Sequence, residues 1–121
     1  KFNLAEDRFW VDNFSPDFNY FVFKEKNGFW SGIVLRPKEG KSPILLKKDL
    51  LKIEGSKDLE KFFITSPGFR EGEFSDFLLS GQSVRDLKFS RMTSVFVYGW
   101  YKGNLIMTTS ERAFGEAVNR L

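Results

Sequence analysis

Two β-prone runs on either side of Asn27-Gly28 form the clearest pattern of apolar and polar positions in the chain. An Asn-Gly pair between such runs favours a hairpin, because a type I′ turn needs positive φ at both central residues. With these two residues as the turn, residues 20–26 pair with residues 29–35, and Phe23 lies opposite Gly32, which leaves room for its ring. Both faces of this hairpin are apolar, so we expect it to be covered on both sides or strongly curled.

A helical pattern follows the hairpin. Ser42-Pro43 combines an N-cap residue with proline at the first helical position. Gly55-Ser56 then interrupts the pattern before it resumes. The apolar positions recur at helical spacing: Leu46, Leu50 and Ile53 before the interruption, Leu59, Phe62 and Phe63 after it. We expect two short helices or one broken helix here, with Lys47, Lys48 and Lys52 facing solvent.

The second half of the chain predicts mainly strands. Residues 74–79 and 84–89 are candidate short strands, and residues 94–100 and 105–109 form a second hairpin. A final helix follows Thr109 or Ser110 as its cap. Its apolar stripe comprises Ala113, Phe114, Ala117, Val118 and Leu121. The segment Phe9-Trp10-Val11 fits either a strand or a packed loop. These elements predict an α+β fold, with a mainly antiparallel sheet of four to six strands and helices packed on it.

Length and composition place all 121 residues in one domain, residues 1–121. Phenylalanine accounts for 15 residues, so we expect a core built on aromatic rings. No apolar run approaches the length that crosses a bilayer. The chain begins without Met and ends inside a helical pattern, so we expect it to be a fragment of a longer protein.

The chain contains neither cysteine nor histidine. These absences exclude disulfides, thiolate chemistry, the usual general base and the usual zinc ligands. Nineteen basic residues stand against sixteen acidic ones, and the two signs are interleaved between residues 24 and 61. This mixture is typical of a solvated surface rather than of a concentrated basic face. We expect no cofactor, no metal site and no catalytic residue.

Other motifs that could carry chemistry are incomplete. No Ser-x-x-Lys pairing with its supporting elements occurs, and Gly40-Lys41-Ser42 lacks the upstream glycine of a phosphate loop. The acidic residues between 12 and 17 lack the alternate spacing of a calcium loop. Glu71 and Glu73 are the best candidates for a catalytic carboxylate pair, and exposed surface acids explain them better.

Aromatic residues beside the two hairpin turns are the candidate binding residues. Trp30 follows the first turn, and Trp100 and Tyr101 precede Lys102 at the second. Exposed rings at these tips could stack on a sugar, a base or a protein partner. The alternative, which we favour because tryptophan is usually mostly buried, is that the rings complete a Phe-rich core.

The second half also resembles a known pattern. The matching residues are Val84-Arg85, Val97-Tyr98-Gly99-Trp100, residues 104–110, Phe114, Ala117 and Leu121. Together they resemble uncharacterised extracytoplasmic domains of bacterial membrane-anchored proteins, in which an Arg-bearing strand leads to a hairpin and a closing helix. The resemblance covers about the last 40 residues, within one domain. Met107 stands where isoleucine is typical. The resemblance implies an extracytoplasmic location and a membrane-anchored parent without known enzymatic activity.

These observations favour a non-catalytic structural or protein-interaction module of an exported bacterial protein. Its partner would be a protein or a cell-envelope component, met through hairpin-tip aromatics or an exposed sheet edge, and that edge could also pair with another copy. Two alternatives remain open. One is a cytoplasmic nucleic-acid-binding module with a mildly basic surface, and the other is a carbohydrate-binding or carboxylate-based hydrolytic domain.

Overall fold

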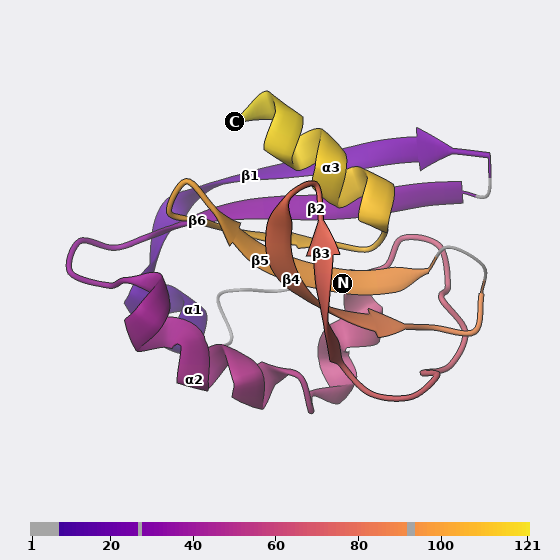
Figure 1. Cartoon of the computed structure of the whole chain (residues 1–121), viewed down its shortest axis with the longest axis horizontal. Helices are drawn as coiled ribbons and strands as arrows, with labels where there is room; N and C mark the ends of the chain where they lie inside the picture. Colours follow the sequence, from indigo (N-terminus) through magenta and orange to yellow (C-terminus); the bar gives the residue numbers. More distant parts are fainter. Residues whose placement is uncertain (1–7, 27, 92–93) are drawn as a thin grey trace.

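The computed structural model describes residues 8–26, 28–91 and 94–121. Their strands form a single antiparallel sheet with the order β1-β2-β6-β5-β4-β3 (Figure 1). The strands are β1 (Phe14–Glu25), β2 (Gly28–Pro37), β3 (Ser75–Leu79), β4 (Gln82–Lys88), β5 (Val95–Tyr101) and β6 (Asn104–Thr108). The helices are α1 (Arg8–Asn13), α2 (Pro43–Ile53), the 3₁₀ helix η2 (Lys57–Phe62) and α3 (Glu111–Arg120). The predicted α+β fold with a mainly antiparallel sheet is confirmed.

Helices cover both faces of the sheet. Helix α3 lies over β2, β5 and β6 on one face, and α1, α2 and η2 lie on the other (Figure 1). Each face has its own apolar core. The α3 face buries Val34, Val84, Val95, Val97, Ile106, Phe114 and Ala117. The core around α1, α2 and η2 is richer in rings, with Trp10, Phe14, Phe62, Phe63, Phe89 and Phe96 among its buried residues. The core built on aromatic rings that the sequence predicts is this second core.

The first hairpin forms, but its register differs from the predicted one by two residues. Glu25 pairs with Gly28, so Phe21 rather than Phe23 lies opposite Gly32. A β-carbon on Gly32 would lie 2.2 Å from Cζ of Phe21. Gly28 adopts φ +138° within the strand instead of occupying the turn, and a β-carbon there would lie 2.7 Å from Oγ1 of Thr65. Glycine is therefore needed at position 28 for two reasons, its own positive φ and the close approach of Thr65, and the turn rule cannot take the second into account.

The helices begin where the sequence predicts. Ser42 caps α2, its Oγ accepting a hydrogen bond of 3.3 Å from the N–H of Leu45, and Pro43 is the first helical residue. The interrupted pattern becomes one α-helix followed by one 3₁₀ helix. Residues 9–11, predicted as strand or loop, lie instead in the short helix α1, where Trp10 is buried. No helix in the described part of the chain has both the length and the hydrophobicity to cross a membrane.

Candidate functional site

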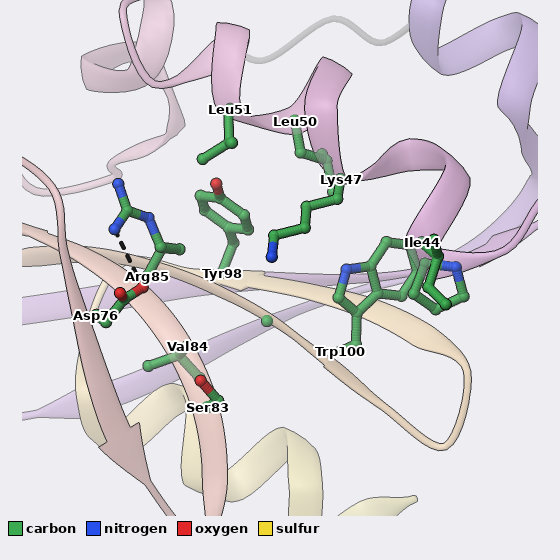
Figure 2. A pocket seen from close by; sticks show the side chains of 12 residues that line it. Ile44, Lys47, Leu50, Leu51, Asp76, Ser83, Val84, Arg85, Tyr98 and Trp100 are labelled. Atoms are coloured by element: carbon green, nitrogen blue, oxygen red, sulfur yellow. Dashed lines mark hydrogen bonds and ion pairs between the residues drawn. The ribbon is translucent and has the colours of Figure 1, made fainter.

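A half-open groove separates α2 from the sheet (Figure 2). Its volume is about 280 Å³. One wall is α2, and the other consists of β4 and β5 with Asp76 of β3 at the edge. The residues that line it are Pro43, Ile44, Lys47, Leu50, Leu51, Asp76, Ser83, Val84, Arg85, Tyr98, Gly99 and Trp100.

The α2 wall of the groove presents uncovered apolar side chains. Ile44 is 87% exposed and Leu51 is 42% exposed, although both line the groove. The core-facing side of the same helix buries Leu46 and Leu50 at 2% and 3% exposure. The apolar stripe of α2 is therefore wider than the sheet beneath it can cover, and the surplus faces the groove.

Lys47 is the cationic group of this apolar wall. It lies one helical turn from Ile44 and one from Leu51 on the same face of α2. Its ammonium group points into the groove between the rings of Tyr98 and Trp100 (Figure 2). Within the described ranges Lys47 forms no ion pair. An anionic group entering the groove would therefore find this cation ready to form an ion pair.

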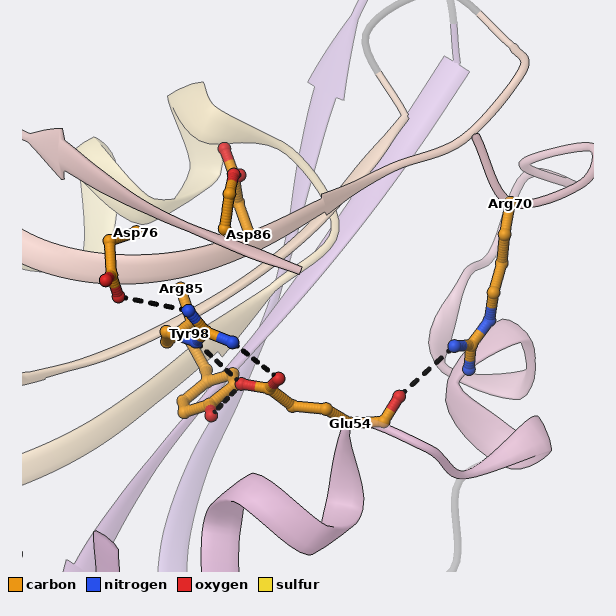
Figure 3. Close-up of polar contacts among 7 residues, drawn as sticks. Glu54, Arg70, Asp76, Arg85, Asp86 and Tyr98 are labelled. Atoms are coloured by element: carbon orange, nitrogen blue, oxygen red, sulfur yellow. Dashed lines mark hydrogen bonds and ion pairs between the residues drawn. The ribbon is translucent and has the colours of Figure 1, made fainter. Parts of the chain in front are cut away.

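A polar cluster at one end of the groove ties α2 to the sheet (Figure 3). Glu54, the C-cap residue of α2, accepts hydrogen bonds of 2.8 Å from Nε and Nη2 of Arg85 on β4. The hydroxyl of Tyr98 on β5 donates to the same carboxylate over 2.5 Å. Arg85 also donates to Asp76, at 3.1 Å, from its Nη1. Both carboxylate oxygens of Glu54 are thus engaged by the sheet.

The protonation of this cluster follows from its contacts. Burial raises the pKa of the Tyr98 phenol, and its hydrogen bond to the Glu54 carboxylate raises it further. The hydrogen bond to Glu54 likewise raises the pKa of Arg85. Tyr98 therefore stays neutral and Arg85 stays charged at any physiological pH. Neither group has the titration behaviour of a general base.

Arg70 holds the end of α2 from the other side (Figure 3). Its Nη1 donates to the carbonyl oxygen of Glu54 over 3.1 Å, and its Nη2 donates to the carbonyl of Ser56. Carbonyls at the C-terminal end of a helix lack intrahelical partners and carry partial negative charge, so a guanidinium group there is stabilising. The position of α2, and with it the width of the groove, is fixed by two arginines from different segments.

The structure separates the predicted binding residues. Trp100 is half-buried and lines the groove. Trp30 is 0% exposed, because it packs inside the core, so its ring offers no surface to a partner and we leave it out of the site. Tyr101 packs against the core of the α3 face instead. Lys102 lies over the Tyr101 ring at 5.5 Å and donates to the carbonyl of Leu121.

Most of the groove was not predicted from the sequence. Lys47, expected to face solvent, is exposed on the wall of the groove, and Ile44 and Leu51 were not among the candidate residues. One sequence signal could have indicated the groove: residues 44, 47 and 51 share a helical face next to the predicted core positions, so the apolar stripe of this helix is wider than its core contacts require. Glu71 and Glu73 are both exposed. Glu71 borders a separate cavity of about 380 Å³ together with Glu25, and Glu73 does not line that cavity.

The chemical content of the site fits binding by shape and charge. In residues 8–26, 28–91 and 94–121, no three acidic side chains gather closely enough to hold a metal ion. The groove instead combines exposed aliphatic carbons, two aromatic rings and a lysine. Comparison with models of known protein families finds no match for this chain, and comparison with curated proteins finds none either.

Proposed function

We propose that the domain is a non-catalytic interaction module that binds an extended segment of a partner protein in the groove between α2 and the sheet. The observation that carries this proposal is the exposure of Ile44, 87%, on the wall of a half-open cavity. A bulky apolar side chain seated against Ile44, Leu51 and Trp100 would cover these carbons. Contacts of this kind supply most of the free energy of peptide recognition in grooves.

The size and charge of the groove define the segment. A volume of about 280 Å³ lies just below the ~300–1,000 Å³ typical of small-molecule pockets, so one or two side chains of a longer ligand fit better than a whole small molecule. Lys47 favours an aspartate or glutamate next to the inserted residue. The preferred segment therefore pairs a bulky apolar residue with an adjacent acidic one.

The polar cluster supports a non-catalytic role. Glu54 is a carboxylate at the end of the groove, and both its oxygens accept hydrogen bonds from Arg85 or Tyr98. A general base needs a carboxylate that can take a proton from a substrate. The contacts of Glu54 instead hold α2 in place. The two alternatives, a nucleic-acid-binding module and a carbohydrate-binding or hydrolytic domain, both rely on exposed tryptophan rings. The ring of Trp30 is buried, which supports neither of them.

The cellular location remains part of the proposal. The resemblance of residues 84–121 to extracytoplasmic bacterial domains supports an exported, membrane-anchored parent protein. Protease treatment of intact cells tests this location. Cleavage of the native protein before lysis supports it, and protection until lysis, in step with a cytosolic marker, contradicts it.

Titration with short synthetic peptides tests the groove. The probe is an N-acetylated, C-amidated pentapeptide with central Phe-Glu, and its matched control carries Phe-Gln. Backbone amide shifts should move at α2, β4 and β5, with weaker binding for the Phe-Gln peptide. Ile44→Asp should abolish the binding of both peptides, because it places a charge on the apolar wall.

Charge reversal on α2 separates specific recognition from general attraction. Lys47→Glu should reverse the preference between the two peptides, whereas Lys48→Glu, an exposed neighbour outside the groove lining, should leave it unchanged. Equal effects of the two variants, or shifts that map outside the groove, would contradict the proposed site.

A further inference from the structure

Strand β1 forms an open edge of the sheet with an exposed apolar row. Residues 18–25 pair continuously with β2, and on its other side β1 has no neighbouring strand among the described residues (Figure 1). Phe18, Tyr20 and Val22 alternate along one face of this edge and are 46%, 51% and 52% exposed. Residues 18–23 contain no proline, glycine or charge. An edge of this kind is a template for pairing with another strand.

The opposite edge of the sheet is less suited to such pairing, although Phe77 and Leu78 are exposed there. Strand β3 has 5 residues, against 12 in β1. It also carries Asp76 with its side chain 82% exposed, which disfavours an apolar partner strand. On β1 the corresponding protection is confined to the ends, where Pro16 and an irregular register precede Phe18 and Lys24 follows Phe23.

We propose that β1 pairs antiparallel with β1 of a second copy, about a two-fold axis that lies midway between the two Tyr20 residues. Antiparallel residues that lie opposite each other share a face, so a two-fold axis perpendicular to the sheet must pass through a residue position. With the axis at Tyr20, the two Tyr20 side chains face each other and each Phe18 faces Val22 of the other copy. Aromatic and β-branched residues are favourable cross-strand partners.

The neighbouring registers are less favourable. With the axis at Phe21, Asp17 lies opposite Glu25 of the other copy, which places like charges together. With the axis at Asn19, Val22 lies opposite Pro16, and proline cannot donate a hydrogen bond to the ladder. The register centred on Tyr20 avoids the pairing of like charges, moves Pro16 to the end of the ladder opposite Lys24, and matches the symmetry of the exposed row.

The area of this contact indicates a weak dimer. A buried aromatic side chain covers about 150–250 Å², so the exposed halves of Phe18 and Tyr20 offer roughly 100 Å² each. With Val22 and the strand backbone, two copies bury less than the ~1,200 Å² at which stable interfaces begin. Main-chain hydrogen bonds between the two edges add to the apolar contacts. Association should therefore depend on protein concentration.

The dimer is independent of the proposed groove. The groove involves β3, β4 and β5, whereas β1 is at the other end of the strand order. Two copies joined through β1 would keep both grooves open towards the outer ends of one continuous sheet. Variants of the β1 edge should leave peptide binding by a single copy unchanged, so each proposal can fail without the other.

Cysteine cross-linking tests the register directly, because the natural chain has no cysteine. Phe18→Cys and Val22→Cys should each stay monomeric on mild oxidation, while an equal mixture of the two should form disulfide-linked heterodimers. In the proposed register, position 18 of one copy lies about 13 Å along the strands from position 18 of the other, too far for a disulfide, whereas positions 18 and 22 lie opposite each other. Leu78→Cys, 70% exposed on β3, is the control for random collision.

Sedimentation of the unmodified protein completes the test. The apparent mass should rise with concentration, and Tyr20→Lys should keep the protein monomeric. A monomer at every concentration overturns the proposal. The proposal is also overturned if Phe18→Cys or Val22→Cys alone cross-links as efficiently as the mixture, or if Leu78→Cys cross-links at the same rate as the mixture.

Discussion

Arg85 on β4 donates two parallel hydrogen bonds of 2.8 Å to the carboxylate of Glu54 at the end of α2. A carboxylate at the C-terminal end of a helix is unfavourable by itself, because that end carries partial negative charge. The guanidinium group of Arg85 reverses this unfavourable interaction, and its fork geometry matches the carboxylate. The pair therefore orients α2 over the sheet and sets the width of the groove.

Removing Arg85 should destabilise the domain substantially. Arg85→Ala leaves the Glu54 carboxylate, whose side chain is 13% exposed, with Tyr98 as its remaining side-chain donor among the described contacts. Hydrogen bonds to charged groups contribute roughly 1.5–3 kcal/mol, so we expect the free energy of unfolding to fall by about 2 kcal/mol. Urea denaturation measures this change.

The matched control removes the exposed partner of the same arginine. Asp76→Ala deletes a carboxylate whose side chain is 82% exposed, and exposed ion pairs contribute about 0–1 kcal/mol. Equal losses for Arg85→Ala and Asp76→Ala would contradict the assignment of Glu54 as the important partner.

Tyr98 should make the stability fall at alkaline pH. Because burial raises the pKa of its phenol, the folded state keeps a proton that the unfolded state releases above about pH 10. Its contribution is complete below that pH and decreases by up to about 1.4 kcal/mol per pH unit above it. Urea denaturation from pH 8 to pH 11 should show a steeper loss for the natural protein than for Tyr98→Phe. Parallel curves for the two proteins would refute this prediction.

Local chemistry made the elements predictable. The caps at Ser42 and Ser110 depend on one or two neighbouring residues, and the strands depend on runs of β-prone residues, so short windows of sequence sufficed. In the observed register of the first hairpin, Phe21 approaches Gly32 closely, and the hydroxyl of Thr65 accepts a hydrogen bond from the N–H of Phe29, 36 positions away. No short window of sequence contains the contact with Thr65.

The groove was beyond local prediction for the same reason. Glu54 and Arg85 are separated by 31 positions, and their pairing depends on how α2 crosses the sheet. Ile44 and Leu51 become candidate contacts only because the sheet leaves them uncovered. Trp30 and Trp100 were candidates because rings at hairpin ends are difficult to bury completely. The favoured interpretation was that they complete the core, and the ring of Trp30 does so.

The contact between Phe21 and Gly32 gives a prediction about the hairpin. A β-carbon at position 32 would overlap the Phe21 ring at 2.2 Å, and overpacking of this kind costs about 1–3 kcal/mol. Gly32→Ala should lower the midpoint of urea denaturation, and Phe21→Leu in the same protein should recover part of the loss. Gly55→Ala is the control, because the nearest atom to its β-carbon lies 3.9 Å away. An additive double variant would show that Phe21 does not cause the strain.

The two serine caps should differ in strength. Oγ of Ser110 accepts a hydrogen bond of 3.0 Å from the N–H of Ala113 and is buried, while the bond from Leu45 to Ser42 is 3.3 Å long at a more exposed helix end. Loss of a serine cap costs about 0.5–2 kcal/mol, and the buried site should lie at the upper end, since water cannot replace the lost acceptor. Thermal denaturation should show a larger fall in Tm for Ser110→Ala than for Ser42→Ala. If the order were reversed, the anchoring of α3 would have to come from its apolar stripe rather than from its cap.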